Sequence, residues 1–504
     1  MSLVSNLFLL LIAAALLVYY LVPDRFKWMV LLLFSYLYYI AGGVRYVLFI
    51  LYSTIVIYLF ARLIEKKREG GASQKVLKRL AAAGLICNLG MLGAVKYTAF
   101  FVENINHIPG ISLPVPWILF PLGISFYTFQ SCGYLLDVYW ERTKAERNIF
   151  KFALFVSFFP QLMQGPIGNF EKLQPQLLAP HRFDAGNMAM GLARMVRGFA
   201  KKMIIADWAG VFVDAIFGDP DRFAGAAVAA VILYGIQLYA DFSGAMDVVI
   251  GTAQLFGITL DENFKRPYLA ISLTDFWKRW HITLGQWMKN YVFYPLTLSG
   301  FMKKISKWSR SRFGKKIGRV VPVAIADVIV FLLVGVWHGP SWKYVVYGLY
   351  NGLIIAFSEL MAGSYRSARE RLHLTGREGW YHLFMILRTY VIVQFSFFFD
   401  RADSLGHGLQ MIRLAFTHFD WSTLLQVSAG KEGTAYAPWA LLTIGIGCLV
   451  MVIIGVLEER GVKVREKLLA LPLPAACLIY VALLTTIGLF GLTGVPRGFI
   501  YAQF

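Results

Sequence analysis

Long apolar runs separated by short polar turns recur along the whole of this chain. A helix needs roughly 20 mostly apolar residues to cross the hydrocarbon core of a bilayer. Runs that approach this length lie near residues 4–22, 27–42, 45–62, 80–102, 117–136, 149–163, 189–216, 224–256, 321–337, 342–362, 381–399, 436–457 and 472–490. The pattern therefore predicts an all-α polytopic membrane protein with about 11–13 transmembrane helices. We expect the first run to be a retained helix, because it lacks the basic segment and cleavage site of a signal peptide.

The apolar pattern is interrupted in the middle of the chain, from about residue 120 to 300. Polar and helix-breaking residues enter in PLGISFYTFQ at 121–130, FFPQLMQGPIGNF at 158–170, YADFSGAMD at 239–247 and ENFKRPY at 262–268. Non-helical backbone at membrane depth is tolerated only where protein buries it or water reaches it. We therefore expect a cavity or re-entrant structure here, within a single membrane domain that covers residues 1–504.

The segment TDFWKRWHITLGQWMKNYVFYPL at 274–296 is predicted to form one amphipathic helix. At about 100° per residue, one stripe of that helix collects Phe276, Trp280, Thr283, Leu284, Trp287 and Tyr291. Such a helix more often lies in the membrane interface or re-enters the membrane than spans it. His281 is displaced from the stripe, which would let its ring point into a cleft.

Charge is concentrated in short loops between the apolar runs. The chain has 504 residues, of which 58% are hydrophobic, and its formal net charge is +20. The basic clusters lie at 66–79, 303–319, 366–377 and 460–467. Positive residues in short loops mark the cytoplasmic side. The clusters therefore indicate topology rather than nucleic-acid binding, and contact with an anionic ligand is the alternative. By parity, loops 103–116 and 400–435 and the C-terminal tail would be extracytoplasmic.

Two of the eight histidines stand out, because His281 and His338 each lie beside tryptophan in otherwise apolar sequence, the second in GVWHGPSW at 335–342. An ionisable residue inside the membrane region is a functional hypothesis by default, although a histidine at the end of a span can also be an interfacial anchor. A neutral imidazole can take a proton from a hydroxyl. The sequence has no GxSxG elbow and no HExxH motif. The simplest remaining chemistry is a histidine base that activates a hydroxyl toward an activated acyl group.

Metal and disulfide chemistry are not expected. The four cysteines, Cys87, Cys132, Cys448 and Cys477, lie inside or beside apolar runs without metal-ligand spacing. The acids Asp241 and Asp247 either form hydrogen bonds within the helix bundle or line a polar tunnel.

The ordered set of motifs resembles the membrane-bound O-acyltransferase (MBOAT) family. The set is PLGISFYTFQ, FVSFFPQLMQGPI, YADFSGAMDVVIG, ENFKRPY, FWKRWHITL and VWHGPSW, over residues 115–355, with FIYAQF at the end of the chain. The branch it looks most similar to contains the alginate O-acetylase membrane subunit, and the teichoic-acid D-alanylation membrane protein is more distant. One departure is Lys289–Asn290–Tyr291, where that branch has an acidic residue, and another is Ala502 in place of phenylalanine.

The resemblance implies a set of site residues around a central tunnel. His338 would be the catalytic histidine and His281 a second functional histidine. Tyr501 would be a candidate acyl relay to a secreted partner, with an aromatic residue at the membrane surface as the alternative. The candidate tunnel or substrate-binding residues are Trp337, Asp241, Asn263, Gln130, Gln164 and Trp280.

We therefore expect an O-acyltransferase in the bacterial cytoplasmic membrane. It would move an acetyl group from acetyl-CoA or an acyl carrier protein in the cytosol to an extracytoplasmic polysaccharide, with no bound cofactor or metal. Its partners would be that donor, a secreted or membrane-anchored acyltransferase partner and membrane lipids, but no nucleic acid. Two alternatives are D-alanyl transfer to teichoic acid from a carrier protein and a transporter or flippase for a glycan or lipid.

Overall fold

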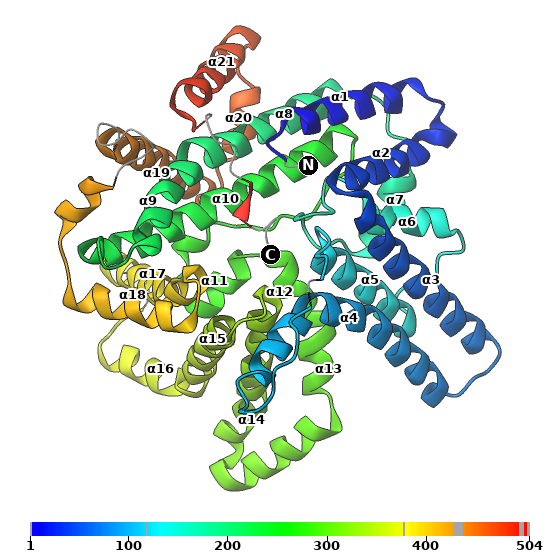
Figure 1. Cartoon of the computed structure of the whole chain (residues 1–504), viewed down its shortest axis with the longest axis horizontal. Coiled ribbons are helices and arrows are strands. Elements are labelled where there is room, and N and C mark those ends of the chain that lie inside the picture. The colour runs from blue at the N-terminus through cyan, green and yellow to red at the C-terminus, as the bar shows by residue number, and fades with distance from the viewer. Residues whose placement is uncertain (1–2, 117, 376–377, 428–436, 493–497, 501–504) are drawn as a thin grey trace. The chain divides into compact units, whose positions relative to one another are not determined.

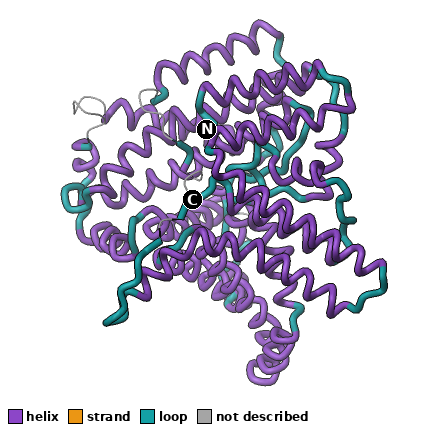
Figure 2. Tube along the Cα trace, turned by 45° about the vertical axis from the view of Figure 1, so that its right-hand side comes forward, coloured by secondary structure: helices purple, strands orange, loops and turns teal. Residues whose placement is uncertain are grey.

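The structure is a computed structural model that describes residues 3–116, 118–375, 378–427, 437–492 and 498–500. Helices and loops make up this part of the chain, as Figure 2 shows. The only β-type pairing among the described residues is an isolated antiparallel bridge between Phe264 and Trp280. The predicted all-α class is therefore confirmed.

Seven of the described helices are long and apolar enough to cross a membrane. They are α3 (Val47–Glu69), α4 (Gln74–Ile105), α10 (Ala227–Leu255), α14 (Gly300–His338), α17 (Gly379–Arg401), α19 (Ala437–Glu459) and α21 (Leu473–Phe490). An eighth span results if α15 (Trp342–Leu360) and α16 (Ala362–Arg371), which bend by 57°, are counted together. The protein is thus a multi-pass membrane protein.

The remaining predicted runs form shorter helices, so fewer spans meet these criteria than the 11–13 expected. These helices are α1 (Asn6–Leu21), α2 (Lys27–Gly42), α5 (Ile124–Tyr139), α6 (Ile149–Ser157), α8 (Ala185–Ala200) and α9 (Asp207–Gly218). Local sequence explains where α5 begins and where α6 ends. Gly123 adopts φ 73° directly before α5, and α6 ends shortly before Pro160, as expected because a proline disfavours helix in the residue before it.

Contacts divide the chain into two compact units that are each assembled from separate segments. The first unit comprises Met1–Ile204, Ala240–Glu262 and Arg460–Phe504, and the second comprises Ile205–Tyr239 and Asn263–Glu459. The single membrane domain over residues 1–504 stays a prediction.

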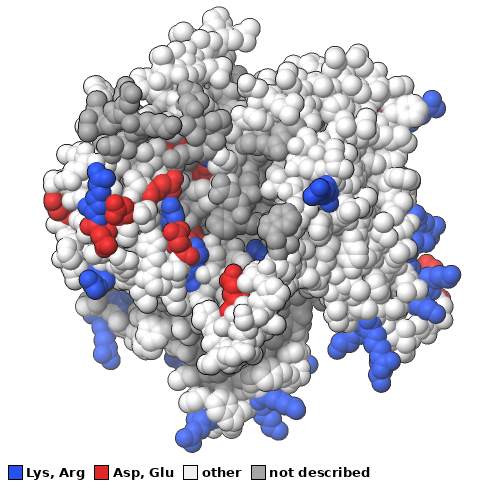
Figure 3. All heavy atoms as spheres, viewed as in Figure 1, with Lys and Arg blue, Asp and Glu red and all other residues white. Residues whose placement is uncertain are grey.

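In the first unit, α3 packs against α4, α5 and α6, and α1 packs against α2 (Figure 1). The short helix α7 (Phe170–Leu178) follows α6, and α8 packs against α20 (Val464–Leu469) and α21. Lys and Arg side chains gather at the ends of α3 and α4, as Figure 3 shows. Lys66, Lys67 and Arg68 lie in the last turn of α3.

In the second unit, α14 and α15 form an extensive helix pair, and α15 also packs against α17. The short helices α11 (Leu273–Arg279), α12 (Ile282–Met288) and α13 (Tyr294–Thr297) lead into α14, and α18 (Leu405–Thr417) packs against α17. Gly314 interrupts α14 with non-helical dihedral angles. The break therefore lies within the basic segment 303–319, before the apolar part of α14 that ends at His338.

The prediction of one continuous helix over 274–296 is wrong. The chain breaks between α11 and α12, where Trp280 is extended and His281 adopts φ 47° and ψ 53°. Pairing explains the break, because the N–H of Lys265 bonds the carbonyl of Arg279 and the N–H of Ile282 bonds the carbonyl of Asn263. Tertiary pairing with ENFKRPY therefore overrides the helical periodicity of this segment.

Candidate active site

The β-bridge sets Asn263 beside His281. The Asn263 Oδ1 lies 3.3 Å from His281 Nδ1, and it accepts hydrogen bonds from the N–H and the hydroxyl of Thr283, both at 3.0 Å. Asn263 is fully buried, and His281 is 2% exposed. One amide oxygen therefore fixes both the histidine and the first turn of α12.

Ion pairs anchor the backbone on either side of this bridge. Arg279 Nη1 lies 3.1 Å from Glu459 at the end of α19, and Arg266 pairs with the same carboxylate. Arg279 also pairs with Asp275 at 3.0 Å. These cations have carboxylate partners, so their arrangement serves to hold the loop that carries His281.

Burial keeps the His281 imidazole neutral. Desolvation lowers the pKa of His281 to about 3, from an ordinary value of 6.5. At physiological pH, the ring therefore acts as a neutral hydrogen-bonding group.

His338 is the last residue of α14 and lies among aromatic rings. Its ring stacks on Tyr344 with centroids 5.9 Å apart, and it meets Tyr347 edge-on at 5.5 Å. The side chain is 4% exposed. A Cβ at Gly339 would lie 2.5 Å from the Tyr344 ring, so the glycine after the histidine permits this close packing.

Trp337 joins the two histidines. Its ring centroid lies 5.1 Å from that of His338 and 5.8 Å from that of His281. A further link holds α11 against α15, because Trp277 Nε1 donates a hydrogen bond to Asn351 Oδ1 at 3.3 Å. The structure thus brings His338, His281, Trp337 and Asn263 into one buried cluster of the second unit.

Trp280 contributes to an aromatic cluster beside the bridge. It stacks on Phe276 at 5.4 Å and meets Phe264 edge-on at 5.0 Å, and Tyr239 and Tyr268 lie close by. Trp280 is 3% exposed. It packs the loop that carries His281.

The other predicted residues belong to the first unit. Asp241 forms a 2.7 Å ion pair with Lys202. Gln130 donates to the carbonyl of Phe155 and accepts from Gln161 Nε2 and the N–H of Gly168, both at 3.2 Å. Gln130 thereby fixes the turn that contains Gln164, which is 2% exposed. Tyr501 lies outside the described residues.

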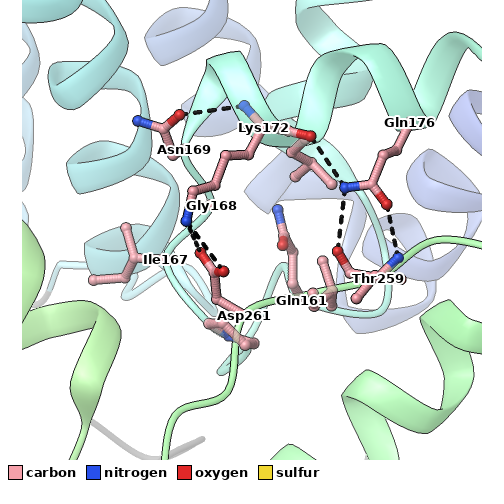
Figure 4. A pocket seen from close by; sticks show the side chains of 11 residues that line it. Gln161, Ile167, Gly168, Asn169, Lys172, Gln176, Thr259 and Asp261 are labelled. Atoms are coloured by element: carbon pink, nitrogen blue, oxygen red, sulfur yellow. Dashed lines mark hydrogen bonds and ion pairs between the residues drawn. The ribbon is translucent and has the colours of Figure 1, made fainter.

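A cavity of about 340 Å³ opens beside that turn (Figure 4). Two contacts between α7 and the segment after α10 border it: Lys172 pairs with Asp261 at 3.3 Å, and Gln176 accepts from the N–H of Thr259 at 2.9 Å. Gln161 points into the cavity in Figure 4, and no described residue donates a hydrogen bond to its Oε1.

Several residues of these sites were not predicted from the sequence. Tyr344, Tyr347 and Asn351 share one face of α15 at spacings of three and four residues, a signal that the run 342–362 does contain. The sequence pattern does not indicate the role of Lys202, because its partner Asp241 is distant in sequence. Among the described residues, no group of three or more His, Cys, Asp or Glu side chains could hold a metal ion.

Comparison with known proteins relates these features to a family. Residues 145–311 match the model of the membrane-bound O-acyltransferase family. A probable alginate O-acetylase of Pseudomonas putida is 32% identical over 423 residues, which cover 83% of this chain and 80% of that protein. A peptidoglycan O-acetyltransferase of Helicobacter pylori is 30% identical, with coverage of 76% and 72%. A teichoic acid D-alanyltransferase of Bacillus subtilis is 26% identical, with coverage of 46% and 58%. The chain belongs to the membrane-bound O-acyltransferase family.

Proposed function

We propose that this protein transfers an acetyl group from a cytosolic thioester to a hydroxyl group of an extracytoplasmic polysaccharide. The observation that carries the proposal is the pair of buried imidazoles that meet Trp337. The relatives named for alginate and peptidoglycan O-acetylation support the choice of acceptor. They match this chain with higher identity and coverage than the D-alanyltransferase does, which favours acetyl over D-alanyl.

In this proposal, His338 is the general base. Its imidazole takes the proton of the acceptor hydroxyl as the oxygen attacks the thioester carbonyl. The new C–O bond forms, the C–S bond breaks, and the imidazolium returns its proton to the leaving thiolate. His281, held neutral by burial, orients the donor or the acceptor by hydrogen bonding. Trp337 separates and positions the two rings.

The donor in this proposal is acetyl-CoA or an acetylated acyl carrier protein. The basic clusters of the loops suit the phosphates of coenzyme A and the acidic surface of a carrier protein equally. The tunnel residues would be Gln130, Gln164 and Asp241. A secreted or membrane-anchored partner would complete transfer to the polymer.

Tyr501 is the proposed relay to that partner. Its phenolic oxygen would attack the thioester and lose its proton to the base, which gives a tyrosyl ester and a free thiol. A hydroxyl of the partner would then take the acetyl group and return a proton to the tyrosine.

The test is donor turnover by purified protein with labelled acetyl-CoA or labelled acetyl carrier protein. A general base contributes typically 10²–10⁴-fold to the rate, so His338→Ala is expected to lower release of free thiol by about that factor. Elution volume and melting temperature should stay those of the unaltered protein.

His418→Ala is the matched control, because His418 is an exposed histidine, and its turnover should be unchanged. Normal turnover by folded His338→Ala protein would remove His338 from the chemistry. Absence of turnover with either donor in the unaltered protein, together with transport of a labelled glycan or lipid, would favour the transporter alternative.

A further inference from the structure

The last described residues of the chain form hydrogen bonds with a buried ion pair. Lys202 Nζ donates to the carbonyl of Gly498 at 3.0 Å, and Asp241 Oδ2 accepts from the N–H of Ile500 at 2.8 Å. Lys202 and Asp241 bond each other through the second carboxylate oxygen at 2.7 Å. Both charged groups therefore divide their hydrogen bonds between each other and the backbone of residues 498–500.

The ion pair and Phe499 form the buried part of this attachment. The side chains of Lys202 and Asp241 are 3% and 1% exposed. Phe499 is 1% exposed, and its ring centroid lies 5.0 Å from the Lys202 ammonium. The N–H of Leu492 bonds the carbonyl of Met203 at 3.1 Å, so the chain is held at two points between the end of α21 and Ile500.

Close helix packing creates the place for the ion pair. A Cβ at Gly198 of α8 would lie 2.6 Å from the carbonyl oxygen of Gly244 in α10, and a Cβ at Gly244 would lie 2.8 Å from that of Gly198. These glycines let the two backbones approach directly beside Lys202 and Asp241. The pair therefore lies beside a close contact between α8 and α10.

The depth of the attachment is unexpected for a tail at the membrane surface. Asp241 is the middle residue of α10, one of the helices that are long and apolar enough to cross a membrane. At 1.5 Å per residue, this lies about 21 Å from either end of the helix. The backbone of Ile500, which directly precedes Tyr501 in the chain, is thus held at the middle of a span.

Stability alone is a poor explanation for such a pair. Replacing a buried ion pair by apolar residues is often neutral or stabilising, because the cost of desolvating both charges offsets their attraction. A pair that binds two backbone groups of the terminal segment has a further effect, since it fixes where that segment lies.

We propose that Lys202 and Asp241 are positioning residues that hold residues 498–500 so that Tyr501 is presented for acyl transfer. This role rests on the proposed relay through Tyr501. The attachment of the segment itself does not depend on that relay and can be measured separately.

A neighbouring ion pair provides a matched control. Lys201 lies 2.6 Å from Asp247 and 3.2 Å from Ser243, and its side chain is 10% exposed. Asp247 is also bonded by Arg194 at 3.1 Å. This second pair involves the same two parts of the chain, but its hydrogen bonds and ion pairs are made to Ser243 and Arg194 rather than to residues 498–500. Lys201→Met therefore separates loss of a buried cation from loss of the attachment.

The first measurement is hydrogen exchange of the Phe499 and Ile500 amides in the purified full-length protein. A hydrogen bond to a charged group is worth about tenfold or more in local equilibrium, so Lys202→Met should speed this exchange at least tenfold. Ile500→Pro removes the N–H that donates to Asp241 and leaves the buried charges intact, so it tests the attachment even if Lys202→Met fails to fold. Because proline carries no amide proton, exchange in this variant is read at Phe499 alone. Lys201→Met and Ile500→Val should exchange as the unaltered protein does. Unchanged exchange in Ile500→Pro and Lys202→Met would overturn the attachment.

The second measurement is the rate at which labelled acetyl-CoA places an acetyl adduct on the peptide that contains Tyr501. Lys202→Met and Ile500→Pro are expected to slow adduct formation about tenfold, Lys202→Arg should largely restore it, and Tyr501→Phe should abolish it. Faster exchange with an unchanged adduct rate would overturn the positioning role. An unaltered protein that releases coenzyme A without any Tyr501 adduct would overturn the relay, and with it the positioning role, whereas the exchange result would still decide the attachment.

Discussion

At the scale of single residues, the candidate site depends on one unusual backbone conformation. His281 has φ 47°, a left-handed conformation that costs a non-glycine residue roughly 1–2 kcal/mol. The bridge hydrogen bonds and the three contacts of Asn263 Oδ1 hold it in place. The conformation turns the histidine away from the helix that its own sequence favours.

Burial of His281 predicts acid sensitivity of the fold. Its pKa is lowered to about 3 in the folded protein, against 6.5 ordinarily, so below pH 6.5 the unfolded chain binds a proton that the folded chain does not. The free energy of unfolding should therefore fall by about 1.4 kcal/mol per pH unit as pH drops below 6.5. Melting temperature measured between pH 7 and pH 5 should fall less steeply for His281→Gln than for the unaltered protein.

The control is His418→Gln, which replaces an exposed histidine and should keep the original pH dependence. An identical slope for His281→Gln and the unaltered protein would show that the ring takes up a proton in the folded state as readily as in the unfolded state.

At the scale of helices, the α14–α15 pair forms the surroundings of His338. Glycines allow the approach, because a Cβ at Gly335 would lie 2.2 Å from the carbonyl oxygen of Tyr344, and one at Gly348 would lie 2.5 Å from that of Phe331. Small residues at helix contacts allow this kind of close packing within membranes. The spacing of α14 and α15 therefore fixes the distance from His338 to the Tyr344 and Tyr347 rings of α15.

Gly348→Ala should push the two helices apart. Overpacking of this kind costs typically about 1–3 kcal/mol, so we expect a lower melting temperature and slower donor turnover. Gly445→Ala in α19 is the control, since a Cβ there meets nothing within 4 Å. Equal melting temperatures and turnover rates for the two variants would mean that the contact adapts without affecting the site.

At the scale of the whole molecule, charge determines the expected orientation in the membrane. The basic residues of 303–319 precede the apolar part of α14. The basic residues of 366–377 precede α17, and the segment that follows α17 lies at the other end of α17. The positive-inside rule therefore assigns the basic segment 303–319 to the cytosol and the segment that follows α17 to the outside.

Cysteine labelling tests this orientation. Lys307→Cys and Asp403→Cys each replace an exposed charged residue. In intact cells, a membrane-impermeant maleimide should label Asp403→Cys but not Lys307→Cys, and inverted vesicles should give the reverse. The unaltered protein, with its four native cysteines, provides the background. Labelling of Lys307→Cys in intact cells would reverse the assignment.

The sequence alone determined the all-helical membrane class, the interruption of the middle of the chain and the importance of His281 and His338 as candidates. These follow from local quantities: apolar length decides whether a helix can span, and a histidine in apolar sequence is costly wherever it lies. The family and its enzymatic class were also predictable from the ordered motifs, and the comparisons confirmed them.

Only the tertiary structure decided how these residues meet. The break at His281 comes from pairing with Asn263, which is distant in sequence, and so the helical period of 274–296 was misleading. The partners of Asp241 were likewise not predictable, because Lys202 and the backbone of Ile500 are distant from it in sequence. The physical reason is that a buried polar group must be satisfied by whichever partner the fold brings near it, and that partner is chosen by packing rather than by neighbouring sequence.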